Sequence, residues 1–201
     1  MRLHAVLKGS LANGPRRAAV VWFQVCFRRC PGCCNPQTHD QYGGYEREVD
    51  DVANEIIEDG SIGGMTLTGG EPLDQFDSAL HLVTVVHRMR PELCIVLFTG
   101  HELDHPSFLE YIRDQTKVPW EEARIKVDRL FAQIDVLVEG PYDRTKPGKD
   151  PLVASSNQKV SFPSGRYGPN DLIDIPRVEV FINEEGEIIE TGFGCVLSHG
   201  G

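Results

Sequence analysis

The chain has 201 residues, 40% of them hydrophobic and 25% charged, a composition that suits one globular domain with a sizeable buried core. Its 30 acidic residues outnumber its 20 lysines and arginines and give a formal net charge of −10, which argues against a nucleic acid or an anionic membrane surface as the main partner. No apolar run approaches the ~20 residues that span a bilayer, and the N-terminus lacks the apolar stretch of a signal peptide, so we expect a cytoplasmic protein without membrane contact.

Strand-like and helix-like patterns alternate from Ala18 to Gly140. Short apolar and β-branched runs predict strands at residues 18–25, 65–68, 93–98 and 134–138. Apolar side chains at helical spacing predict helices at residues 46–59, 73–90, 107–115 and 120–133. Strands that alternate with helices imply a parallel sheet, so we expect an α/β fold.

Beyond Gly140 the amino-acid composition changes. Residues 143–174 are rich in proline, glycine, serine and charge. Residues 177–182 then alternate like a half-exposed strand and are followed by a turn and a second short apolar run. We predict a β-hairpin packed on the edge of the sheet. The whole chain, 1–201, would form one domain with a core of about 13–160 and an extension of about 161–201.

Cysteines crowd into one short loop. Cys26, Cys30 and Cys33 form a C-x3-C-x2-C set, and Cys34 follows directly. Such crowding without a secretion signal indicates metal binding rather than disulfides. A four-iron cluster normally takes four thiolates. Three would leave one iron with an open coordination position, and an open position on a metal is where chemistry takes place.

A structural zinc site is the alternative interpretation of these cysteines, with Cys34 or His39 as the fourth ligand. Two features argue against it. Adjacent Cys33 and Cys34 are poor geometry for one tetrahedral ion, and no second Cys/His pair at zinc-finger spacing follows. Cys34 is better explained as a small residue that packs beside a cluster.

A second motif, Gly69-Gly70-Glu71-Pro72, follows the predicted strand at residues 65–68. Paired glycines let bare backbone groups approach a ligand because no Cβ stands in the way. The Glu71 carboxylate suits an ammonium group, and Pro72 favours the start of the next helix. Both motifs fall where predicted strands end, and the carboxyl ends of parallel strands carry the ligand site.

These motifs resemble those of radical S-adenosylmethionine enzymes, and among them the glycyl-radical activases. The resemblance runs from about Asn13 to Val160 and departs from the family at Val25, where glycine often precedes the first cysteine. The segments that carry it are Asn13–Pro15, Cys30–Cys33, Asn35–Pro36, Thr38, Thr68–Leu73, Phe98–Gly100, Ile134–Gly140 and Ser155–Gln158.

The resemblance implies a partial (β/α) barrel with a C-terminal hairpin extension and two cofactors. Cys26, Cys30 and Cys33 would ligate a [4Fe–4S] cluster, whose fourth iron would be chelated by the amino and carboxylate groups of S-adenosylmethionine. The implied contacts to S-adenosylmethionine are Gly32, Cys33 and Cys34 on the nucleoside side, Gly69, Gly70 and Glu71 at the methionyl ammonium, and Thr99 at the next strand end.

The same resemblance implies the reaction. Reductive cleavage of S-adenosylmethionine gives methionine and a 5′-deoxyadenosyl radical, which in the activases removes a hydrogen from a backbone glycine of a partner enzyme. We therefore expect an oxygen-sensitive oxidoreductase that activates a glycyl-radical enzyme such as an anaerobic ribonucleotide reductase. A flavodoxin or ferredoxin would supply the electron, with Arg28 and Arg29 as its docking residues. The alternatives are a radical enzyme that modifies a peptide or small molecule, and a non-catalytic zinc-binding interaction module.

Overall fold

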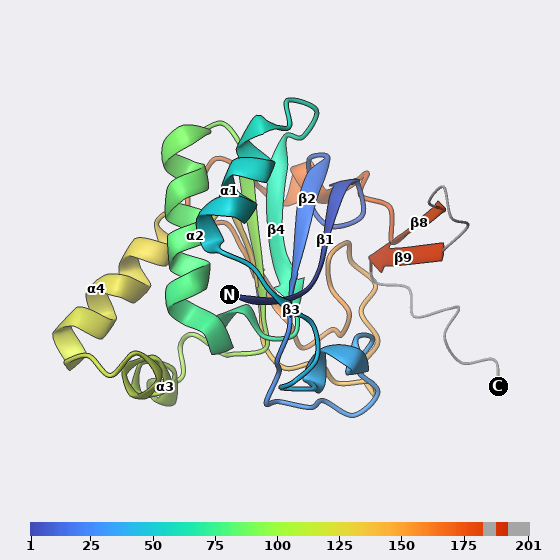
Figure 1. Ribbon diagram of the computed structural model, residues 1–201. Helices are drawn as coiled ribbons and strands as arrows, with labels where there is room; N and C mark the ends of the chain where they lie inside the picture. The colour runs from blue at the N-terminus through green and yellow to red at the C-terminus, as the bar shows by residue number, and fades with distance from the viewer. Residues whose placement is uncertain (183–187, 193–201) are drawn as a thin grey trace.

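A mixed β-sheet is the centre of the computed structural model, which describes residues 1–182 and 188–192 (Figure 1). Within these residues the sheet has seven strands in the order β3-β1-β2-β4-β5-β6-β7. The strands are β1 (Arg2–Ser10), β2 (Ala18–Phe23), β3 (Tyr45–Glu46), β4 (Gly64–Gly69), β5 (Cys94–Thr99), β6 (Val136–Glu139) and β7 (Lys159–Ser161). Neighbours β2, β4, β5 and β6 are parallel, and β1, β3 and β7 are antiparallel to the strands they pair with.

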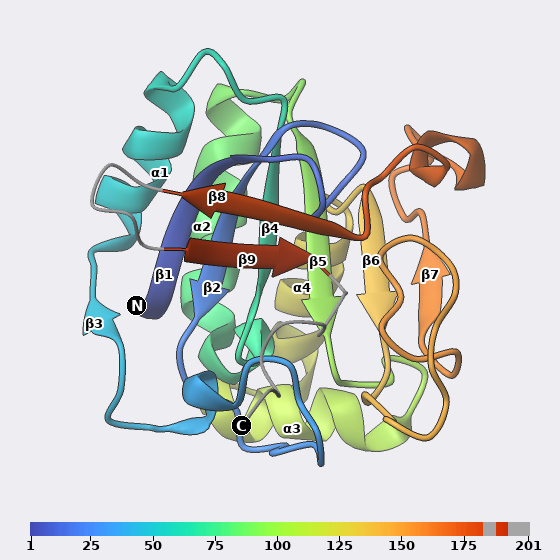
Figure 2. The same cartoon turned by 90° about the vertical axis from the view of Figure 1, so that its right-hand side faces the viewer.

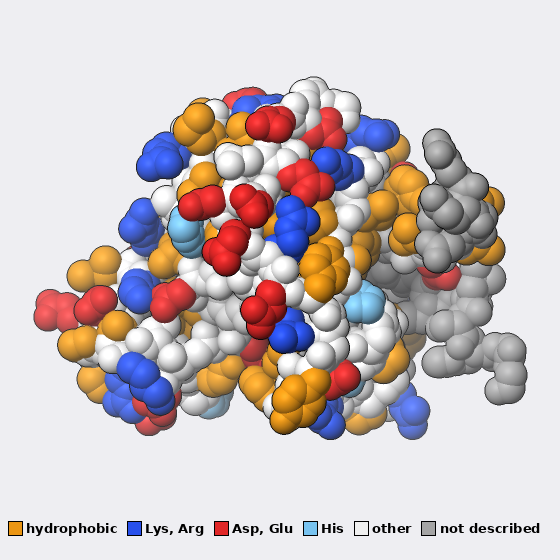
Figure 3. Space-filling view, viewed as in Figure 1, with side chains coloured by type: hydrophobic (Ala, Val, Ile, Leu, Met, Phe, Trp, Pro, Cys, Tyr) orange, Lys and Arg blue, Asp and Glu red, His pale blue; other side chains and the backbone are white. Residues whose placement is uncertain are grey.

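Helices cover one face of this sheet (Figure 1). The α-helices are α1 (Val49–Glu58), α2 (Phe76–Met89), α3 (Pro106–Thr116) and α4 (Trp120–Phe131), and the short 3₁₀ helices are η1 (Pro36–His39), η2 (Pro72–Gln75) and η3 (Pro169–Leu172). Buried side chains such as Leu67, Val83 and Ile95 fill the space between sheet and helices. On the face shown in Figure 3, acidic and basic side chains lie side by side. Ion pairs of the protein include Arg47–Glu55 at 3.0 Å. Within the described ranges, each helix is too short or too polar to cross a bilayer.

The predicted α/β class is confirmed, and strands and helices are found at each position where the sequence predicts them. The sheet order is linear, so the partial barrel stays a prediction. Strand β1 escaped the sequence analysis because register shifts around residues 3–5 and 8–10 break its period-2 alternation. The first residues of the helix predicted at 73–90 form the 3₁₀ helix η2. The Gln75 side chain at its end forms hydrogen bonds with the backbone of Arg2 and Gln24.

The predicted C-terminal hairpin consists of β8 (Val178–Ile182) and β9 (Ile188–Gly192). Its predicted turn lies outside the described residues. The prediction of an edge position was wrong, because the hairpin crosses the sheet face opposite the helices (Figures 1 and 2). Polar contacts hold it against the β1–β2 connection: Ser10 Oγ donates to Glu179 Oε2 at 2.8 Å, and Asn13 Nδ2 donates to Thr191 Oγ1 at 2.6 Å.

A buried ion pair fastens the segment after β7 to the parallel strands. Asp135 is 1% exposed and accepts hydrogen bonds from Ile95 N at 2.9 Å and Arg166 Nε at 2.8 Å. Arg166 also donates to the carbonyl of Leu93 at 2.8 Å. Burial opposes ionisation of Asp135, but the bonds from Arg166 and Ser164 outweigh it and lower the pKa of this carboxyl. The carboxylate therefore depends on Arg166 for its charge balance.

Replacing Arg166 with methionine should lower the free energy of unfolding by about 2–3 kcal/mol, because it leaves a buried carboxylate without its cation. Urea unfolding of the two proteins measures this difference. Arg124→Met, on the exposed side of α4, is the control and should change stability by less than about 0.5 kcal/mol. Equal losses in the two variants would contradict the assignment.

Candidate functional site

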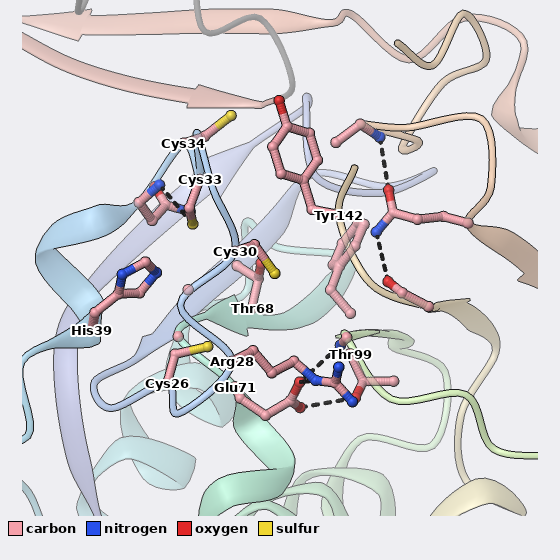
Figure 4. A pocket seen from close by; sticks show the side chains of 18 of the residues that line it. Cys26, Arg28, Cys30, Cys33, Cys34, His39, Thr68, Glu71, Thr99 and Tyr142 are labelled. Atoms are coloured by element: carbon pink, nitrogen blue, oxygen red, sulfur yellow. Dashed lines mark hydrogen bonds and ion pairs between the residues drawn. The ribbon is translucent and has the colours of Figure 1, made fainter. Parts of the chain in front are cut away.

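The carboxyl ends of the parallel strands open into one cavity of about 140 Å³. Loops that follow β2, β4, β5 and β6 build its wall, as the positions of the two motifs predict. The predicted site residues that line it are Cys26, Cys30, Cys33, Cys34, Gly69, Gly70, Glu71 and Thr99. The cysteine loop and the diglycine turn, some forty residues apart in sequence, thus face the same space (Figure 4).

Gly32 is the predicted site residue that does not line this cavity. Its φ of +74° is a left-handed conformation that favours glycine, and a Cβ there would lie 3.1 Å from Arg144 Cδ. The loop geometry explains this glycine, and its contact with the nucleoside stays a prediction.

The thiols of Cys26, Cys30 and Cys33 are free and lie around a common space, while Cys34 points away from it (Figure 4). Burial raises the pKa of Cys26 to about 11 and also raises the pKa of Cys33. These thiols therefore need a bound metal to favour their thiolate form. Among the described residues, no three His, Cys, Asp or Glu side chains lie close enough together to hold a single ion. A four-iron cluster bonds each thiolate through a different iron, so its ligands need not converge on one ion.

Two backbone hydrogen bonds join the cysteine loop to the diglycine turn. Gly70 N donates to Phe23 O at 2.8 Å, and Glu71 N donates to Val25 O at 2.9 Å. Val25 has a φ of 78°, a left-handed conformation that is unfavourable for a β-branched residue. This explains why glycine suits the position before the first cysteine. A Cβ on Gly70 would lie 2.2 Å from Val25 O, so the two segments fit only with glycine there.

Glu71 is 1% exposed and accepts several hydrogen bonds inside the protein. Its Oε1 accepts from Leu73 N at 3.0 Å and from Thr99 Oγ1 at 2.8 Å, and its Oε2 accepts from Gly100 N at 2.8 Å. The carboxylate therefore ties the ends of β4 and β5 together, a role that the sequence analysis did not assign. Its contact with a ligand ammonium stays a prediction.

Arg28, which the sequence analysis named as a docking residue for the reductant, also lines the cavity. Its Nε lies 3.8 Å from Glu71 Oε2. A Cβ on Gly100 would come within 2.5 Å of Arg28 Cδ, so the glycine makes room for the arginine. Burial raises the pKa of Glu71 to about 7, helped by the negative charge of nearby Asp74 and opposed by its hydrogen-bond donors. Arg28 supplies the compensating positive charge.

Other cavity residues were not predicted as contacts to S-adenosylmethionine, among them Tyr142, Gln158 and His39, which the sequence analysis considered only as a zinc ligand. Gln158 holds its own loop: its Oε1 accepts from Ala154 N and Ser155 N, both at 3.1 Å, and its Nε2 donates to Gly140 O at 3.2 Å. The sequence did offer a signal for Gln158, because Ser155–Gln158 is one of the segments that resemble the glycyl-radical activases. Tyr142 carries no comparable signal in this sequence.

Comparison with known proteins matches residues 12–161 to the family described as "4Fe-4S single cluster domain". The chain belongs to this family. It is 31% identical over 142 residues to a pyruvate formate-lyase-activating enzyme of Listeria monocytogenes, a match that covers 68% of this chain and 51% of the relative. It is 28% identical over 153 residues to the anaerobic ribonucleoside-triphosphate reductase-activating protein of Enterobacteria phage T4, covering 74% of this chain and 85% of that protein.

The chain thus spans about half the length of the Listeria relatives and most of the phage protein. These matches confirm the resemblance to the radical S-adenosylmethionine activases, which implies a [4Fe–4S] cluster and S-adenosylmethionine as cofactors. The free thiols around one space fit that cluster. The β8–β9 hairpin lies beyond the segment that matches the 4Fe-4S family.

The affinity for S-adenosylmethionine should depend on pH through Glu71. Its raised pKa of about 7 means that the carboxyl becomes protonated below that pH and loses its attraction for a cationic ligand. Affinity should therefore fall by up to about tenfold per pH unit below the pKa. Glu71→Gln should bind more weakly above that pH and show a flatter profile. Equilibrium binding to the oxidised, reconstituted protein across this range measures both, and parallel profiles would refute the role.

Proposed function

We propose that this chain is a radical S-adenosylmethionine oxidoreductase that activates a glycyl-radical enzyme. The observation that carries the proposal is the shared cavity, in which the thiols of Cys26, Cys30 and Cys33 face the same space as Gly69, Gly70 and Glu71. The names of both relatives described above support the activating function. The parallel strands that carry this cavity would be the core of the partial barrel.

Each element of the site has a task in this reaction. The three thiolates would hold the cluster, and the cluster would supply the electron for reductive cleavage of S-adenosylmethionine to methionine and the 5′-deoxyadenosyl radical. The turn at Gly69 and Gly70 presents bare backbone to the methionyl group, and Glu71 supplies negative charge for its ammonium. Arg28 balances that charge from the cysteine loop.

The partner we propose is an anaerobic ribonucleotide reductase. The match covers 85% of the phage activating protein, whose name specifies an anaerobic ribonucleoside-triphosphate reductase. The reductant would be a flavodoxin or ferredoxin in the cytoplasm. Arg28 is exposed but pairs with Glu71, so the exposed Arg29 and the 65% exposed Phe27 are the better docking residues for the reductant. A zinc module is less favoured, since the described residues offer no single-ion site.

Anaerobically reconstituted protein with a strong reductant should convert S-adenosylmethionine to 5′-deoxyadenosine and methionine. Cys26→Ala should reduce this to the level of a protein-free reaction, because one cluster corner loses its ligand. Cys94→Ala is the control: this thiol is buried in β5 among apolar residues, away from the cavity lining, and its loss should leave most of the activity. Product formation that is equal in the two variants would remove the proposal.

The choice of partner needs its own assay. Addition of an anaerobic ribonucleotide reductase to the active mixture should give the electron paramagnetic resonance doublet of a glycyl radical. Formation of 5′-deoxyadenosine without that doublet would keep the radical chemistry and exclude this partner. A radical enzyme that acts on a peptide or small molecule would then be the favoured alternative.

A further inference from the structure

His39 contributes a buried ring nitrogen to the cavity wall. Its Nε2 has no hydrogen-bond partner among the described residues. In Figure 4 the ring points from η1 toward the space around the thiols of Cys26 and Cys33. A buried polar nitrogen without a hydrogen-bond partner costs about 1–3 kcal/mol of folding free energy. Such an atom calls for an explanation, and a bound group in the cavity would provide the missing partner.

The backbone on both sides of His39 is fixed by one buried side chain. Gln24 follows β2, and its Nε2 donates to Gln37 O at 3.0 Å and to Asp40 O at 2.8 Å. Within η1, Thr38 Oγ1 donates to Asn35 O at 2.7 Å. The backbone that carries the ring is therefore held by a residue that directly follows the strand leading into the cysteine loop.

The ring is a hydrogen-bond donor rather than a cation. Burial, and secondly the positive charge of Arg29, lower the pKa of His39, which favours the neutral ring. A neutral imidazole carries one N–H. Sulfur acceptors on the cavity side would satisfy its N–H.

We propose that His39 Nε2–H donates a hydrogen bond to a sulfur atom of the cluster held by Cys26, Cys30 and Cys33. The inference rests on the proposed function, which supplies the cluster. Hydrogen bonds to the sulfurs of a cluster stabilise its more negative, reduced state and so raise its reduction potential. His39 is then a positioning residue that makes the cluster easier to reduce by a weak physiological donor.

His101 provides a matched control inside the same protein. Its Nε2 is also buried without a partner in the described part of the chain. However, its ring packs against Phe108 and Tyr111, with centroids at 5.5 and 4.6 Å, and it does not line the cavity. Loss of His101 therefore removes a similar buried ring without removing a donor to the cluster.

The test is the midpoint potential of the cluster in the full-length, anaerobically reconstituted protein, followed by electron paramagnetic resonance. His39→Phe should shift the potential to a more negative value, because the donor is lost. His39→Gln, whose amide nitrogen replaces Nε2, should restore most of the wild-type potential. His101→Phe should leave it unchanged. A potential for His39→Phe equal to that of the wild type and of His101→Phe would overturn the proposal.

A second measurement decides the case if His39→Phe does not take up iron. Wild-type protein made with isotopically ring-labelled histidine should show a hyperfine coupling between the reduced cluster and a ring nitrogen, and His101→Phe should retain it. Absence of that coupling would overturn the proposal. Neither measurement needs S-adenosylmethionine or a partner, so normal 5′-deoxyadenosine formation without the coupling would count against His39 alone, not against the proposed function.

Discussion

The rest of the site depends on the backbone contact between the cysteine loop and the diglycine turn. Parallel pairing of β2 with β4 brings Phe23 opposite Gly69, and the bonds Gly70 N–Phe23 O and Glu71 N–Val25 O extend this pairing past the ends of both strands. The N–O distances of these two bonds are 2.8 and 2.9 Å. The cysteine loop and the diglycine turn therefore cannot separate without breaking backbone hydrogen bonds at the carboxyl ends of β2 and β4. The sheet therefore places a metal-binding loop and a ligand-binding turn on one cavity.

The sequence predicted which residues meet in this cavity, but it did not predict the packing contacts and hydrogen bonds that require those residue types. The pair Gly69-Gly70 was expected to make room for a ligand, yet Cβ atoms there would come within 2.7 Å of Trp22 Cα and 2.2 Å of Val25 O. Packing against the neighbouring strand is thus sufficient to require glycine. Likewise, the hydrogen bonds of Glu71 to the end of β5 could not be predicted, because they join segments whose relative position only the folded sheet defines.

The fold was predictable where the pattern of apolar residues is regular. The parallel strands and the helices between them follow directly from period and length. Strand β1 did not, since its register shifts interrupt the alternation. The position of the hairpin could not be predicted from the sequence either. Glu179 and Thr191 form hydrogen bonds with polar groups at the β1–β2 connection, and such contacts leave no periodic pattern in the sequence.

The central claim is that three thiolates hold a four-iron cluster whose remaining iron is free to bind S-adenosylmethionine. Mössbauer spectroscopy of protein reconstituted with the Mössbauer isotope of iron tests it most directly. The account predicts that addition of S-adenosylmethionine changes the signal of one iron in four and leaves the others nearly unchanged. A spectrum in which every iron has a sulfur environment and none responds to the ligand would contradict it.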